Sequence, residues 1–136
     1  MQEYVTLSID INHDAGALYE RLWRPEAFLE WASGLCGANL KREGLKQDGE
    51  VWTGEGMEGQ LRVRFSGPND FGVLDHWVAQ AGEPENYVPL RVIANGAGAT
   101  VCLTVFRPPG MADGMFATEA EWVKRDLQAL KEWVEG

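Results

Sequence analysis

The sequence predicts an α+β fold in which an antiparallel sheet is covered by one long helix. Residues 5–11 alternate strictly between apolar and polar side chains, the pattern of a half-buried strand. Residues 38–107 contain turn signals at regular spacing, which is typical of successive hairpins. Residues 113–134 carry apolar side chains at intervals of three and four, the pattern of an amphipathic helix. Such a helix after a run of strands is expected to cover one face of the sheet.

Two short helices are predicted after the first strand. Asn12 and Asp14 are residue types that cap helix N-termini, so we expect a helix to begin there. It ends at Pro25, because the residue before a proline is pushed out of the helical region. The second helix is predicted to contain Phe28, Leu29, Trp31 and Ala32 and to end at Gly34 and Gly37.

The following region is predicted to form a meander, giving about seven strands with the first one. We expect its strands over residues 38–45, 50–55, 60–66, 71–80, 86–94 and 99–107. Asp48-Gly49 and Asn95-Gly96 are the strongest turn signals between them, because these dipeptides accept positive φ. Asp113 is the expected N-cap of the last helix, whose apolar seam is Phe116, Ala120, Val123, Leu127, Leu130 and Val134.

Turn positions also predict strand registers, and registers sort the side chains onto two faces. A turn at Pro68-Asn69 places Val63 opposite Leu74, and a turn near residues 82–84 places His76 opposite Leu90. The predicted inner face, which meets the last helix, is Trp52, Leu61, Val63, Phe65, Leu74, His76, Val78, Val88, Leu90, Val92, Val101, Leu103 and Val105. The predicted outer face is Arg62, Arg64, Asp75, Trp77, Arg91, Cys102 and Thr104.

Asp75 and His76 are adjacent but are predicted to lie on opposite faces, because neighbouring side chains alternate along a strand. They therefore cannot form a catalytic dyad. Asp75 is expected between Arg62 and Arg91 in an exposed ladder of charges. His76 is the only ionisable group on the predicted inner face. It is either a hydrogen-bonded core residue or a polar anchor or weak general base in a ligand pocket.

The layout resembles the START-like, helix-grip superfamily (SRPBCC), which includes polyketide-cyclase-like and Hsp90-activator-like members. The resemblance spans nearly the whole chain, which we expect to form one domain over residues 1–136. It rests on the segment Leu18-Tyr19-Glu20-Arg21-Leu22-Trp23-Arg24-Pro25-Glu26 followed by Phe28 and Trp31, on the meander, and on the helix after Arg107-Pro108-Pro109-Gly110. Arg24 stands where the family usually has an acidic residue. The resemblance implies a cavity between a curved sheet and the last helix, with no fixed catalytic set.

Binding of a small hydrophobic molecule in that cavity is the function we expect first. The candidate lining residues are Trp52, Val63, Phe65, His76, Leu90, Leu103, Met115, Phe116 and Trp122. The first alternative is a cyclase- or dehydratase-like enzyme in which His76 transfers a proton. The second is a protein-interaction module, resembling Hsp90 activators, that uses Arg64, Trp77 and Arg91 on the outer face.

Charge and composition argue against several other classes. The net charge of −9 disfavours binding to nucleic acid or to an anionic membrane surface. Two cysteines without Cys-x-x-Cys spacing and two histidines offer no metal motif, and we expect neither metal nor cofactor. The sequence shows no signal peptide and no apolar run of about 20 residues, so a cytoplasmic location without membrane insertion is predicted.

Overall fold

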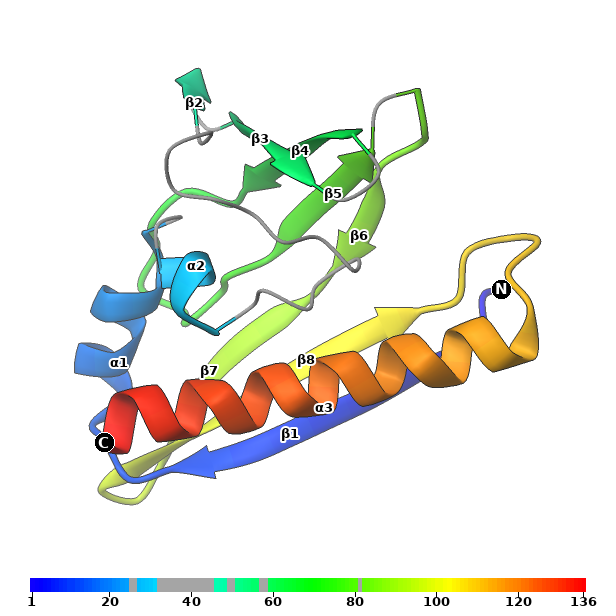
Figure 1. The fold of residues 1–136 in the computed structure, drawn as a ribbon. Coiled ribbons are helices and arrows are strands. Elements are labelled where there is room, and N and C mark those ends of the chain that lie inside the picture. Colours follow the sequence, from blue (N-terminus) through cyan, green and yellow to red (C-terminus); the bar gives the residue numbers. More distant parts are fainter. Residues whose placement is uncertain (25–26, 32–45, 49–50, 57–58, 81) are drawn as a thin grey trace.

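The computed structural model describes residues 1–24, 27–31, 46–48, 51–56, 59–80 and 82–136 (Figure 1). Its elements occur in the order β1 (Tyr4–Ile11), α1 (Ala15–Leu22), α2 (Phe28–Trp31), β2 (Lys46–Asp48), β3 (Val51–Gly56), β4 (Gly59–Phe65), β5 (His76–Gln80), β6 (Asn86–Val88), β7 (Leu90–Asn95), β8 (Gly98–Phe106) and α3 (Asp113–Glu135). The predicted α+β class, with antiparallel strands and a long C-terminal helix, is confirmed. Four predicted features reach or lie outside the described residues: Pro25, the helix end at Gly34 and Gly37, the strand over 38–45 and the Asp48-Gly49 turn.

The strands form two antiparallel sheets, in the orders β1-β8-β7 and β2-β3-β4-β5-β6, instead of the single sheet expected. The predicted strand over 86–94 is divided at Pro89, which has no N–H to donate to a ladder. Backbone hydrogen bonds nevertheless join the sheets: Leu74 N donates to Leu90 O at 2.9 Å, and Thr104 N donates to Pro89 O at 3.0 Å. The two sheets therefore continue into one bent surface.

Helix α3 runs along β1 and β8, and β3 to β5 rise away from it (Figure 1). Val123, Leu127, Leu130 and Val134 of its seam are buried, whereas Phe116 and Ala120 at its N-terminal end are half-buried. Asp113 is not the N-cap, which is Ala112 without a side-chain cap bond. Asp113 is the first helical residue, and its carboxylate lies 2.6 Å from the guanidinium of Arg107.

Helix α1 begins as predicted. The Asp14 carboxylate caps it by accepting a hydrogen bond from Ala17 N at 3.0 Å. The apolar side of the helix buries Leu18, Tyr19 and Leu22 in the core.

The register of the last hairpin is confirmed, with Leu90 opposite Leu103. The registers around β5 are wrong: Val63 lies opposite Val78 instead of Leu74, and His76 lies opposite Val88 instead of Leu90. The reason is the segment 66–75, where β5 begins five residues later than predicted. Asn69 holds this segment: its Oδ1 accepts from Phe71 N and Val73 N, and its Nδ2 donates to Val73 O.

Asp75 is buried, not exposed as predicted. It does face Arg91, to which it is ion-paired. Arg62 is not its neighbour, because Arg62 lies opposite Ala79 in the true register. Tyr87 donates a hydrogen bond to the carboxylate at 2.6 Å in place of Arg62. The predicted ladder of three exposed charges is therefore a buried carboxylate bound by one arginine and one tyrosine.

Candidate functional site

His76 lies at the start of β5 with its imidazole fully buried at 0% exposure. Its Nδ1 is 3.2 Å from the carbonyl oxygen of Leu74. The ring of Phe65, its ladder partner on β4, lies 5.9 Å away between centroids. The buried side chains on the same face of the sheet are Val78 on β5 itself, Leu61 and Val63 on β4, and Val88 on β6. His76 is thus a polar group set in an apolar wall.

Burial lowers the pKa of the His76 imidazole from 6.5 to about 4, because the charged form loses its hydration. The hydrogen bond to Leu74 and the negative charge of Asp75 raise the pKa, but by less. The ring is therefore neutral at physiological pH. A carbonyl oxygen can only accept, so Nδ1 carries the proton and Nε2 is the acceptor nitrogen of this tautomer.

The structure distributes the predicted lining residues over both sheets and the helix. Val63, Phe65, Leu90 and Leu103 are buried in the core. Trp52 on β3 is half-buried and lies opposite Val63. Phe116 and Trp122 on α3 are half-buried as well, and Met115 is 41% exposed. Trp52, Val63, Phe65 and His76 share one face of three adjacent strands, while Leu90 and Leu103 pair with each other in the other sheet.

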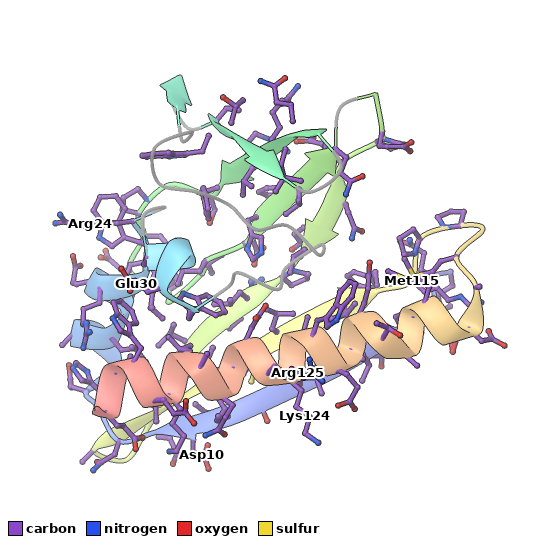
Figure 2. The ribbon with its side chains drawn as sticks, viewed as in Figure 1. Asp10, Arg24, Glu30, Met115, Lys124 and Arg125 are labelled. Atoms are coloured by element: carbon purple, nitrogen blue, oxygen red, sulfur yellow. The ribbon has the colours of Figure 1, made fainter. Side chains whose placement is uncertain are left out.

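One flank of α3 carries polar groups that the sequence analysis missed. At 100° per residue, the residues beside the buried seam form one stripe, namely Met115, Glu119, Trp122, Asp126 and Trp133. The guanidinium of Arg21 on α1 lies 4.5 Å from the centre of the Trp133 ring, so this flank faces the side of α1. Met115 and Lys124 point to opposite sides of the helix in Figure 2.

Glu119 and Asp126 are the acidic members of this flank. Asp126 is buried at 6% exposure, and burial raises the pKa of the half-buried Glu119 carboxyl. Their spacing of three and four residues from Trp122 is the signal in the sequence that could have identified them. The arrangement supplies hydrogen-bonding groups beside an aromatic ring.

Neither a cluster of metal-ligating side chains nor a membrane-spanning helix is found in the described part of the chain. No group of three or more His, Cys, Asp or Glu side chains that could hold a metal ion occurs among those residues. Within the same residues, no helix has the length and apolar character needed to cross a membrane.

Solved structures provide the comparison for this fold, since no protein-family model and no curated protein matches the chain. An uncharacterised protein from Bacillus thuringiensis superimposes with a TM-score of 0.72 at 15% identity, covering 98% of this chain and 100% of that one. A START superfamily protein from Mycobacterium smegmatis gives 0.68 at 10% identity, covering 97% of both chains. The Aha1 dimer from Colwellia psychrerythraea gives 0.68 at 12% identity, covering 96% of this chain and 94% of that one. The protein therefore has a START-like, helix-grip fold.

Proposed function

We propose that the protein binds a small, largely apolar molecule between the inner face of the sheet and α3. Trp52, Val63 and Phe65 would form the sheet wall, and Phe116 and Trp122 the helix wall. The START-like fold supports the proposal, because the resemblance to that superfamily implies a cavity in this position. Half-buried aromatic side chains are also common in small-molecule sites, where they cover large areas with few rotatable bonds.

The observation that carries the proposal is the neutral, fully buried imidazole of His76 within an apolar wall. Nε2 is an acceptor in the tautomer fixed by Leu74. A ligand that reaches this ring would therefore present a hydroxyl or N–H donor at one end and apolar surface elsewhere.

Binding accounts for this histidine better than proton transfer does. A general base is most effective when its pKa lies near the working pH. With a pKa of about 4, the His76 imidazole is a weak base at neutral pH. It is suited to orienting a ligand by a hydrogen bond.

Titration with N-phenyl-1-naphthylamine, a neutral fluorescent probe with one N–H donor, tests the proposal. We expect saturable one-to-one binding. Trp52→Ala is expected to weaken it by about tenfold or more, since the lost ring contact is worth about 1.5 kcal/mol or more. Native mass spectrometry of freshly purified protein is expected to show retained small molecules in addition.

Trp23→Ala is the matched control. Trp23 is also half-buried, but its indole N–H donates to Glu20 and its ring lies against Arg24 at the end of α1. This variant should bind the probe as the unchanged protein does. No saturable binding, or equal weakening by both variants with the fold intact, would contradict the proposed site.

A further inference from the structure

The inward face of α3 changes from buried to partly open along the length of the helix. Residues three or four positions apart share one face of a helix, so Glu119 lies in line with Phe116 before it and Val123 after it. Val123 and Leu127 are buried at 5% and 2% exposure, whereas Phe116 and Glu119 are half-buried. A molecule held between the sheet and α3 would therefore approach solvent beside the turn of the helix that carries Glu119.

Glu119 has a carboxyl group that nothing compensates at this position. Among the described residues, no hydrogen bond and no ion pair reaches this group. Burial raises the pKa of the Glu119 carboxyl, because the charged form loses hydration and no neighbouring charge or hydrogen bond acts in the other direction. A cation brought to this carboxylate would supply the interaction that partial burial has taken away.

The positive charge beside this part of α3 is already paired. The guanidinium of Arg107 lies 5.8 Å from the centre of the Phe116 ring. It forms ion pairs with Glu3 at 3.0 Å and with Asp113 at 2.6 Å, and it donates hydrogen bonds to the carbonyl oxygen of Met111. Two carboxylates therefore balance this guanidinium without Glu119.

Two aromatic side chains flank the Glu119 carboxyl group. Phe116 precedes it by three residues and Trp122 follows it by three, which brings both rings beside it on the helix surface. The faces of aromatic rings attract cations, and a carboxylate binds an ammonium group through charge-assisted hydrogen bonds. Resting on the binding site proposed above, we propose that the ligand is an amphipathic amine whose protonated nitrogen binds the Glu119 carboxylate, with its apolar part between the sheet and α3.

Other end groups of a ligand fit this position less well. A carboxylate would be repelled by Glu119 and by the net charge of −9. A hydroxyl group could donate one hydrogen bond, but it would leave the negative charge uncompensated. A metal ion needs several ligands, and the described residues include no group of three or more that could hold one. A protonated amine supplies both a positive charge and N–H donors.

Displacement of bound N-phenyl-1-naphthylamine by decylamine and by 1-decanol tests the proposal. Decylamine is protonated at neutral pH, as a lysine side chain is, and 1-decanol has the same chain without the charge. We expect decylamine to displace the probe at about tenfold lower concentration than 1-decanol, because it alone forms a charge-assisted hydrogen bond. Glu119→Gln, which removes the charge and keeps the shape, should abolish this preference and leave displacement by 1-decanol unchanged.

Glu121→Gln is the matched control, because it makes the same change in net charge at an exposed position two residues further along α3. It should retain the preference for decylamine, which separates contact with Glu119 from the general attraction of a cation to an acidic protein. Circular dichroism verifies that both variants are folded.

Two kinds of contrary result are distinguishable. Equal displacement by decylamine and 1-decanol in the unchanged protein would overturn the amine assignment while leaving the proposed binding site in place. A preference that survives Glu119→Gln, or that Glu121→Gln reduces equally, would do the same. No saturable binding of the probe to the unchanged protein would overturn the proposed function and this inference with it.

Discussion

The carboxylate of Asp75 accepts a hydrogen bond from the backbone N–H of Leu90 at 3.1 Å. Leu90 is the first residue after the proline that divides the strand. The same carboxylate accepts from the hydroxyl of Tyr87 and pairs with Arg91, so it binds residues on both sides of Pro89. A single buried side chain thus ties the end of β6 to the start of β7, where the surface bends.

Replacing Asp75 is therefore expected to loosen this junction. Asp75→Ala leaves the N–H of Leu90 and the hydroxyl of Tyr87 without their acceptor, and hydrogen bonds to charged groups are worth about 1.5–3 kcal/mol each. We expect the free energy of unfolding to fall by about 2–4 kcal/mol in urea titration. Tyr87→Phe, which removes one of these bonds, should cost about 1 kcal/mol. A loss in Asp75→Ala no larger than that in the exposed Arg62→Ala would show that the junction does not depend on the carboxylate.

Around this bend, the sequence predicted the faces of the strands but not their registers. The assignment of residues to two faces holds for Phe65, His76 and Val78 even though their registers are wrong, because the error is an even number of residues and strand side chains alternate with a period of two. The extent of the segment 66–75 could not be predicted. It depends on the side chain of Asn69 bonding to backbone groups four residues away.

Gly72 is a residue of that segment that should not tolerate a side chain. Its φ is +70°, and a Cβ atom there would collide with the carbonyl oxygen of Val92. Gly82 has a similar φ of +80° with open space around it. Gly82→Ala should cost about 1–2 kcal/mol of stability, the strain of a left-handed conformation alone. Gly72→Ala should cost clearly more in the same urea titration, and equal losses would mean that the collision is relieved without cost.

Substitution of Leu127 tests whether the apolar seam of α3 packs in the core. Leu127 is 2% exposed in the middle of the seam. Leu127→Ala is expected to lower the free energy of unfolding by about 2–5 kcal/mol, as core truncations of this type do. Gln128→Ala, at the exposed next position, should change it by no more than about 0.5 kcal/mol. Similar small losses in both variants would place the seam elsewhere.

His76 should make stability depend on pH. Because its pKa is about 4 in the folded protein and near 6.5 when unfolded, the unfolded chain binds more protons between these values. Stability is thus fully present above pH 6.5 and is lost as the pH falls toward about 4, by roughly 3 kcal/mol in total.

Comparison of two variants isolates this contribution from that of the carboxylates. His76→Gln should show a smaller loss of stability between pH 6.5 and 5 than the unchanged protein. His13→Gln, at the only other histidine, should retain the full loss. Equal slopes for His76→Gln and the unchanged protein would show that His76 does not carry the effect.

The candidate site was predictable on the sheet and less so on the helix. Alternation along the strands was enough to place Trp52, Phe65 and His76 on one face, because a strand has only two faces. Glu119 and Asp126 were missed because a helix turns its residues through all directions, and the apolar seam indicates only the centre of the buried stripe. How far burial extends on either side depends on what packs against the helix.

NMR of the two histidine rings tests ligand binding beside His76 most directly. Protein labelled with ¹³C and ¹⁵N at histidine is titrated with N-phenyl-1-naphthylamine at pH 7, and His13, near the start of α1, serves as the internal reference. If the probe binds between the inner face and α3, the ring resonances of His76 shift and saturate at one equivalent, while those of His13 stay in place. Unchanged His76 resonances at saturating probe would contradict the proposed site.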